Sequence, residues 1–330
     1  MIHKQIINYL HIIQHYNSNK MRKVNHIIGI VLSVFLFFTM IGCNKNSNPQ
    51  MKKPPKHVIL IGLDGMSANS LKSGVAMPNY RSMMKRGSYT LKNRSVLPSS
   101  SAANWASIFM GASPELHGFN TWGSQKPDFD SRELTENNLF PDIFYLIRQV
   151  KPKAEIGHIY EWGGMYYLAD NKSIDNIRQA TLSGINIKSA VAPAVEYIKT
   201  EKPNFCAIVF AEPDGAGHSE GWETDAYYNM LNHLDNALQA IVDAVEQAGM
   251  IDETVFVLVS DHGGKDKKHG GPTLDEMEIP LVFCGKGIKS DFEIPESTMV
   301  YDIASTIGYM FGVNQPQVWI GRPVMSIFEE

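Results

Sequence analysis

The sequence predicts an α/β fold: a doubly wound, mostly parallel sheet with helices on both faces. Short apolar runs alternate with longer amphipathic segments along the chain, which is typical of strands buried between two layers of helices. Asp64, Asp214 and Asp261 each come just after such a run. In open α/β sheets, ligands bind beyond the carboxyl ends of the strands, so the same three positions suggest one site.

Five apolar runs predict strands, and six amphipathic segments predict helices that connect and cover them. The expected strands are His57–Leu63, Ala154–Tyr160, Phe205–Phe210, Thr254–Ser260 and Ile279–Cys284. The expected helices are Met77–Arg86, Asn104–Met110, Asn138–Val150, Ile187–Thr200, Asp225–Ala248 and Asp302–Phe311. No internal repeat interrupts this alternation. With 330 residues and 44% hydrophobic content, the chain can bury one large core.

The N-terminal region has the order of an export signal. From Met21 a basic start leads into the apolar run Ile27–Ile41, then Gly42 and Cys43, which resembles a bacterial lipoprotein signal whose cysteine is acylated. The run has about fifteen residues, fewer than the ~20 that span a bilayer, which favours cleavage over a permanent anchor helix. The anchor helix remains the alternative. Either way we expect the folded domain outside the cytoplasm; as a lipoprotein it would be held at a bacterial membrane through an acylated Cys43.

We divide the rest accordingly. Residues 1–20 lack export character and precede a complete signal, which indicates a start codon assigned too early; residues 21–43 are the signal. Residues 44–55, rich in Asn, Lys and Pro, are expected to be a flexible tether, and residues 56–330 form the folded domain.

Charge and cysteine content limit the classes of function. A formal net charge of -4 offers no basic field for a long nucleic acid, while a small anion handled by metals stays possible. Three cysteines are too few and too scattered for a disulfide framework or a zinc knuckle. Cys206 and Cys284 lie in apolar runs, where a buried, inert thiol is expected.

Two stretches carry side chains that admit more than one role. Asp64 ends the first strand before Gly65, where a carboxylate is either a metal ligand or a cap of the next segment. Ser101 stands in a serine cluster that runs into a helix. A hydroxyl there lies at the positive end of the helix dipole, which suits a phosphate and a nucleophile, but this stretch taken alone favours simple N-capping, the usual role of a serine before a helix.

Two further stretches are more specific for metal binding. Asp214 and His218 are four residues apart with small residues between them, so one helical turn or a tight loop puts both on one face. Asp261 and His262 follow a strand, and His269 comes soon after, in a glycine-rich segment. Mixed oxygen and nitrogen ligands suit zinc best, with manganese or another divalent ion possible.

Taken together, these motifs resemble the alkaline phosphatase superfamily, and within it the type I phosphodiesterase/nucleotide pyrophosphatase group. The likeness runs from His57 to about Met325 and includes Gly-Leu-Asp-Gly at Asp64, Pro-Asp-x-x-Gly-His at Asp214 and Ser-Asp-His-Gly at Asp261. The resemblance implies an alkaline phosphatase-like catalytic domain, a small phosphate-ester substrate and two divalent metal ions, with zinc preferred.

The resemblance also implies roles for single residues. One metal would take Asp214, His218 and His269; the other would take Asp64, Asp261, His262 and the oxygen of Ser101, the nucleophile. Asn104 would contact the ligand, with capping of its helix as the alternative. Trp105, Trp122 and the aromatic run Tyr160–Tyr167 either line a substrate pocket or pack the core. Lys265, Lys267 and Lys268 either attract an anionic substrate or form a solvated loop.

Several departures from the family pattern restrict the prediction. Serine stands where nucleotide pyrophosphatases commonly have threonine, their phosphate-contacting asparagine has no clean match, and the gap from His262 to His269 is short. We expect a phosphodiesterase/nucleotide pyrophosphatase-like enzyme whose preference for nucleotides these departures leave open, with a phosphomonoesterase of the same superfamily as the main alternative. The chain lacks the motif that a sulfatase requires. The segment between Ser101 and Asp214 is too short for the inserted domain of a cofactor-independent phosphoglycerate mutase. A surface lipoprotein that binds metal or phosphate without turnover is the non-enzymatic alternative.

Overall fold

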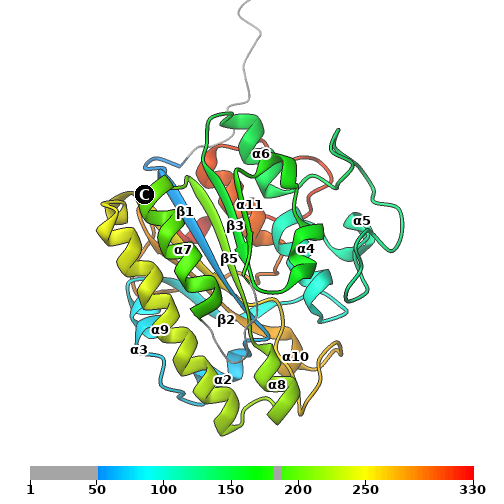
Figure 1. The fold of residues 1–330 in the computed structure, drawn as a ribbon, viewed down its shortest axis with the longest axis vertical. Helices are drawn as coiled ribbons and strands as arrows, with labels where there is room; N and C mark the ends of the chain where they lie inside the picture. The colour runs from blue at the N-terminus through cyan, green and yellow to red at the C-terminus, as the bar shows by residue number, and fades with distance from the viewer. Residues whose placement is uncertain (1–50, 181–187) are drawn as a thin grey trace, which may run out of the picture. The chain divides into compact units, whose positions relative to one another are not determined.

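One mixed sheet organises the computed structural model, which describes residues 51–180 and 188–330 (Figure 1). The described strands are β1 (His57–Asp64), β2 (Gly87–Arg94), β3 (Ile156–Tyr160), β4 (Asn176–Gln179), β5 (Phe205–Pro213), β6 (Thr254–Val259), β7 (Glu278–Gly285) and β8 (Phe292–Glu293). Their spatial order is β4-β3-β5-β1-β6-β7-β2-β8. The five strands from β4 to β6 run parallel, and β7 is antiparallel to both β6 and β2. The predicted fold class is confirmed.

Helices cover both faces of this sheet. The described α-helices are α2 (Ala68–Lys72), α3 (Pro78–Lys85), α4 (Ser101–Met110), α5 (Pro114–His117), α6 (Ile143–Val150), α7 (Lys188–Glu201), α8 (Asp214–Glu220), α9 (Asp225–Gln247), α10 (Leu274–Met277) and α11 (Asp302–Phe311). The described 3-10 helices are η1 (Gly163–Leu168), η2 (Asn171–Ser173), η3 (Ile251–Glu253) and η4 (Met325–Ile327). α4, α6 and α11 pack on one face, and α3, α7 and α9 pack on the other (Figure 1).

The central strand β1 shows why its sequence is apolar throughout. Val58 and Leu60 join the cluster under α4, α6 and α11, while Ile59, Ile61 and Leu63 join the cluster under α3, α7 and α9. Side chains alternate between the faces of a strand, so a strand covered on both sides needs apolar residues at every position. The strand is thereby held rigidly, and Asp64 is presented at its end.

The predicted helix boundaries were wrong at two places. The helix expected from Asn138 begins at Ile143, because Asp142 is its N-cap and accepts a hydrogen bond from Tyr145 N at 2.8 Å. The helix expected from Asn104 begins one turn earlier, at Ser101, with Ser100 as its N-cap. Ile187, the expected start of another helix, lies outside the described residues.

The three strands that were not predicted are polar or very short. β2 reads Gly-Ser-Tyr-Thr-Leu-Lys-Asn-Arg, and its pairing with the apolar β7 places it in the sheet. β4 and β8 are the outermost strands and have four and two residues. Tertiary pairing, rather than an apolar run, specifies such strands.

The end of the predicted tether belongs to the domain. Met51 is 7% exposed and is part of the core cluster on the α4 face, and Pro55 is buried as well, so this segment is attached to the folded unit at both of its ends. The apolar side chain of Met51 explains its placement. The signal, the remainder of the tether and Cys43 lie outside the described residues. Within the described ranges, no helix is long and apolar enough to cross a membrane.

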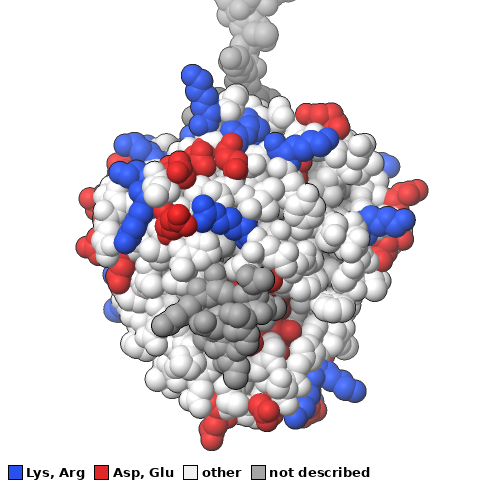
Figure 2. All heavy atoms as spheres, in the orientation of Figure 1, with Lys and Arg blue, Asp and Glu red and all other residues white. Residues whose placement is uncertain are grey.

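Charged side chains of both signs are interspersed on the face of the domain seen in Figure 2, most densely at its upper end. This distribution agrees with the modest net charge of -4. A small net charge with mixed signs gives no strong long-range field, so recognition of an anion must come from local groups.

Candidate active site

Three carboxylates meet at one edge of the sheet. Asp64 ends β1, Asp214 begins α8 directly after β5, and Asp261 follows β6. Because β5, β1 and β6 are parallel neighbours, their carboxyl ends lie side by side. This is the edge at which α8 and α10 are seen in Figure 1.

The first group of ligand-type side chains surrounds Ser101. His262 Nε2 lies 3.4 Å from Asp64 Oδ1 and 3.3 Å from Asp261 Oδ2. Ser101 Oγ lies 3.2 Å from His262 Nε2 and 3.3 Å from Asp64 Oδ1. All four side chains are buried. The Ser101 hydroxyl therefore lies directly beside a cluster of potential metal ligands.

The second group lies next to the first and is more open to solvent. His218 Nε2 is 3.5 Å from Asp214 Oδ2, across one turn of α8, and His269 Nε2 is 3.6 Å from Asp214 Oδ1. The rings of His262 and His269 stack with centroids 3.8 Å apart. Ligand atoms of Asp214, His262 and His269 also lie within 4.8 Å of one another, so His262 stands between the two groups.

The three histidine rings are oriented alike, with Nδ1 facing away from the carboxylates. Each Nδ1 lies beside a backbone carbonyl, to which it donates a hydrogen bond: His262 to Gly263 at 2.8 Å, His269 to Ser99 at 2.9 Å and His218 to Lys267 at 3.0 Å. A carbonyl can only accept, so these contacts assign the proton to Nδ1 and leave the Nε2 lone pairs facing the carboxylates. Metal-binding histidines are oriented in the same way.

These residues fit divalent cations. His218 Nε2 and His269 Nε2 are only 3.1 Å apart, and two lone pairs at that distance repel unless a cation or a proton lies between them. Asp214 Oδ1 and Asp261 Oδ2 are buried and accept no hydrogen bond from any described residue. Carboxylate oxygens and imidazole nitrogens are the donors that zinc and similar ions prefer. A cation would satisfy these unpaired atoms.

Burial shifts the pKa values of the ionisable groups in the site. Burial, followed by the charges of Asp261 and Asp214, raises the pKa of Asp64 well above its usual range. Burial also raises the pKa of Asp261. Burial lowers the pKa of His262, and burial with the neighbouring His262 lowers the pKa of His269. Neutral imidazoles are ready to bind a metal, and bound cations would restore the carboxylates to their charged form.

A second layer of contacts aims the carboxylates. Trp105 Nε1 donates to Asp64 Oδ2 at 3.0 Å, and Gly65 N donates to Asp261 Oδ1 at 3.0 Å. Gly65 has φ +75, and a Cβ atom there would lie 2.8 Å from Asp214 Cβ. Only glycine lets these strand ends approach so closely.

The two residues predicted on the nucleophile helix have different positions. Ser101 is the first residue of α4, and Ser100 occupies the N-cap, so Ser101 does not cap this helix. The structure does not bring Asn104 into the site. Its Oδ1 accepts from Val96 N at 2.7 Å and its Nδ2 donates to Pro98 O at 3.1 Å, so its amide braces the loop before α4 and does not cap the helix.

Sequence reasoning missed three supporting residues: Trp105 as a partner of Asp64, Ser99 and Glu276. Ser99 and Glu276 bind the glycine-rich turn after His269. Ser99 carries no pattern in the sequence that distinguishes it from its neighbours, whereas Glu276 stands in the capping-box pattern Thr273-Leu-Asp-Glu276, which could have marked it. The role of Ser99 emerges only when segments 170 or more residues apart are brought together, whereas Glu276 binds Gly271 five residues away.

The aromatic residues divide into two kinds. Trp105 is fully buried, whereas Trp122 is 65% exposed and stacks on Trp162 with ring centroids 6.1 Å apart and an interplanar angle of 15°. Trp162 follows β3 and therefore lies at the same edge of the sheet as the carboxylates. The lysines at 265, 267 and 268 lie in an exposed turn.

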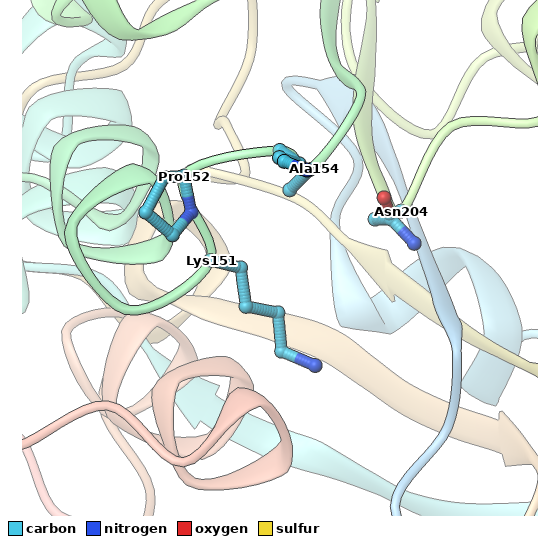
Figure 3. Close-up of a pocket in the computed structure, with 5 residues that line it drawn as sticks. Lys151, Pro152, Ala154 and Asn204 are labelled. Carbon is cyan, nitrogen blue, oxygen red and sulfur yellow. The ribbon is translucent and has the colours of Figure 1, made fainter.

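A separate open hollow lies at the opposite ends of the strands (Figure 3). It is lined by residues that precede β3 and β5: Lys151, Pro152, Lys153, Ala154 and Asn204. The Asn204 amide is already bonded to the backbone, accepting from Glu155 N at 3.0 Å and donating to Lys56 O at 3.1 Å. This hollow contains none of the predicted site residues.

Fold and site together define an α/β protein of the alkaline phosphatase type. The chain belongs to the type I phosphodiesterase / nucleotide pyrophosphatase family, whose model matches residues 58–278. The match includes every predicted metal ligand and Ser101, and it confirms the family resemblance.

Curated relatives are distant and longer. Ectonucleotide pyrophosphatase/phosphodiesterase family member 1 of Rattus norvegicus is 25% identical over 232 residues, which are 67% of this chain and 25% of the relative. Bis(5'-adenosyl)-triphosphatase enpp4 of Xenopus laevis is 26% identical over 248 residues, which are 71% of this chain and 52% of the relative. The chain thus spans a quarter to a half of the length of these relatives.

Solved structures share the fold at low identity. Murine ectonucleotide pyrophosphatase / phosphodiesterase 5, as an inactive variant in complex with AMP, has a TM-score of 0.66 at 14% identity, covering 83% of this chain and 100% of that one. A 2-O GAG sulfatase has a TM-score of 0.65 at 16% identity, covering 82% and 73%. Both similarities concern the fold alone.

Proposed function

We propose that the protein hydrolyses phosphodiesters with Ser101 as the nucleophile, assisted by two divalent metal ions. One observation carries this proposal: a buried serine hydroxyl lies within 3.3 Å of a carboxylate and an imidazole of a cluster that has unpaired ligand atoms. A protein that only binds metal or phosphate has no need of such a hydroxyl at its cluster. Membership of the phosphodiesterase family supports the same reaction.

The chain's residues divide into two ligand sets. Asp64, Asp261 and His262 would hold one ion beside Ser101. Asp214, His218 and His269 would hold the other. Two bound divalent ions supply Lewis acidity, which stabilises charge on the attacking and leaving oxygens of an in-line displacement. Zinc fits the mixture of oxygen and nitrogen donors best.

The serine is positioned for attack by its helix and its neighbours. Ser101 is the first residue of α4, so free backbone N–H groups of the first turn and the helix dipole favour an anion at this point. Its Oγ lies 3.3 Å from Asp64 Oδ1 and 3.2 Å from His262 Nε2, the atoms that would bind the same ion, so that ion would also contact the serine oxygen. Trp105 holds the other oxygen of Asp64, which fixes the direction of Oδ1.

The reaction then has two displacements. The Ser101 hydroxyl loses its proton to solvent and its oxygen forms a bond to phosphorus, while the bond from phosphorus to the leaving oxygen breaks; that oxygen takes up a proton from solvent and departs as an alcohol. Water then cleaves the bond between the Ser101 oxygen and phosphorus, which regenerates the serine hydroxyl and releases a phosphate monoester.

The test compares esters and variants in zinc-loaded protein. Bis(4-nitrophenyl) phosphate should be hydrolysed faster than 4-nitrophenyl phosphate, and 4-nitrophenyl sulfate should not react. Ser101→Ala should lose at least 1,000-fold in kcat, roughly the effect of removing a nucleophile. Ser100→Ala is the matched control, because the Ser100 hydroxyl is buried one residue away without a partner among the described residues.

The outcomes separate the alternatives. A preference for the monoester would identify a phosphomonoesterase. Tight zinc binding without turnover of any ester would favour a binding protein. Equal turnover by wild type and Ser101→Ala would remove the nucleophile from the proposal while leaving the metal sites.

We also propose that the domain is exported and held at a bacterial membrane through an acylated Cys43. The support is the order of basic, apolar and small residues before that cysteine. Labelled palmitate should be incorporated by the wild-type chain and not by Cys43→Ser. Equal labelling of both chains, or none of either, would contradict this anchor.

A further inference from the structure

The turn after His269 is built almost without side chains of its own. Gly270 has φ +108, and a Cβ atom on Gly271 would lie 2.7 Å from Glu276 Oε2. Glycines allow this close approach, but they cannot by themselves hold a fixed conformation. The position of His269 therefore depends on contacts supplied by other segments.

Ser99 supplies one side of these contacts. Its backbone oxygen accepts from His269 Nδ1 at 2.9 Å, and its Oγ accepts from Gly270 N at 3.1 Å and donates to Gly271 O at 2.7 Å. Ser99 is fully buried, so these bonds are protected from water. One residue thus binds three consecutive residues of the turn.

Glu276 supplies the other side. Its Oε1 accepts from Gly271 N at 2.8 Å, and its Oε2 accepts from Thr273 N at 3.2 Å and from Thr273 Oγ1 at 2.6 Å. Its backbone oxygen accepts from Gly263 N at 2.8 Å, directly after His262. Glu276 is 8% exposed, so its carboxylate is committed to the turn.

We propose that Ser99 and Glu276 are positioning residues, which clamp the turn at Gly270 and Gly271 and thereby fix the Nε2 atom of His269 toward Asp214 and His218. The inference rests on the proposed function, in which His269 is a metal ligand. Ser99 is also two residues from Ser101, so the same contacts fix the position of the nucleophile relative to His269. Partners that orient a ligating histidine commonly control metal affinity 10- to 100-fold.

The experiment is a zinc titration of the full chain, in competition with a chromophoric chelator, resolved into two sites. Ser99→Ala removes the hydroxyl but keeps the carbonyl contact to His269. We expect about 10-fold weaker zinc binding at one site, no change at the other, and a similar fall in kcat. Ser100→Ala should match wild type in both affinities.

Two further variants remove the effect of size. Ser99→Thr and Ser99→Val have the same shape, and only the threonine keeps a hydroxyl. Ser99→Thr should therefore bind zinc at least 5-fold more tightly than Ser99→Val at the affected site. Glu276→Gln, which keeps its shape but loses an acceptor, should weaken the same site as Ser99→Ala.

Two results would overturn the proposal: zinc affinities of Ser99→Ala within twofold of wild type, or equal weakening of both sites. Failure of the proposed function looks different. A wild-type chain that binds two zinc ions but hydrolyses no phosphate ester would refute that function, whereas the difference between Ser99→Ala and Ser100→Ala would still test the clamp.

Discussion

Replacing Trp105 by phenylalanine tests how the core aims the site. Trp105 Nε1 donates to Asp64 Oδ2 at 3.0 Å, and both side chains are buried. Asp64 Oδ1, the other oxygen, faces Ser101 and His262. Trp105→Phe removes the donor and leaves an aromatic ring on α4, so the carboxylate loses its fixed direction.

The expected magnitude follows from the burial of the bond. Removing the indole donor leaves Asp64 Oδ2 buried without that partner, which costs about 1–3 kcal/mol. The smaller ring also leaves a gap beside Gly62, which the Trp105 ring contacts closely, and such a core gap costs a further ~1 kcal/mol or more. We expect a total loss of about 2–4 kcal/mol and a fall in kcat/KM of about 10- to 100-fold, as for other partners that orient metal ligands.

The assays are urea unfolding of the metal-free protein and diesterase kinetics of the zinc-loaded protein. Phe109→Leu is the control, because Phe109 is buried on the same helix, its ring centroid lies 6.2 Å from that of Trp105, and a phenyl ring has no hydrogen-bond donor for Asp64. It should lose stability but keep kcat/KM within about threefold. The reasoning is refuted if Trp105→Phe keeps wild-type kcat/KM, or if Phe109→Leu loses as much of it.

Three further predictions address the site and the fold. Gly65→Ala should weaken zinc binding at least 10-fold because its Cβ would press on Asp214, whereas Gly249→Ala, with a similar φ of +70 and open space around it, should only lose roughly 1–2 kcal/mol of stability. Burial lowers the pKa of His158 from its ordinary 6.5 to about 3, so His158 favours the folded state above pH 6.5 and this contribution is lost as the pH falls toward 3. In urea titrations, the free energy of unfolding of His158→Phe should therefore rise relative to that of wild type by about 1.4 kcal/mol per pH unit below 6.5. A difference between the two proteins that does not change with pH would disprove this. Trp122→Ala should raise the KM for an aryl diester two- to tenfold with zinc content unchanged; an unchanged KM would assign the exposed ring to packing alone.

The sequence was sufficient to predict the strands that consist mainly of buried apolar residues. The runs that became β1, β3, β5, β6 and β7 are apolar at nearly every position, and their predicted ends lie within three residues of the observed ones. β2 was missed because its polar sequence acquires strand structure only by pairing with β7. Cys206 and Cys284 are buried free thiols, as predicted.

The site was predictable to the extent that its residues follow strands. Asp64, Asp214 and Asp261 come together because parallel neighbours end at one edge, which sequence order alone implies. The support around them was not predictable. Trp105 looked like a residue of the core or of a pocket, and nothing in the sequence connects Ser99 with His269 across 170 positions.

The most direct test of the two-metal site is anomalous diffraction at the zinc absorption edge from crystals of the full chain grown with zinc. We predict two anomalous peaks per chain, one among Asp64, Asp261 and His262 beside the Ser101 hydroxyl, and one among Asp214, His218 and His269. A single peak, or peaks that lie away from these side chains at saturating zinc, would contradict the account.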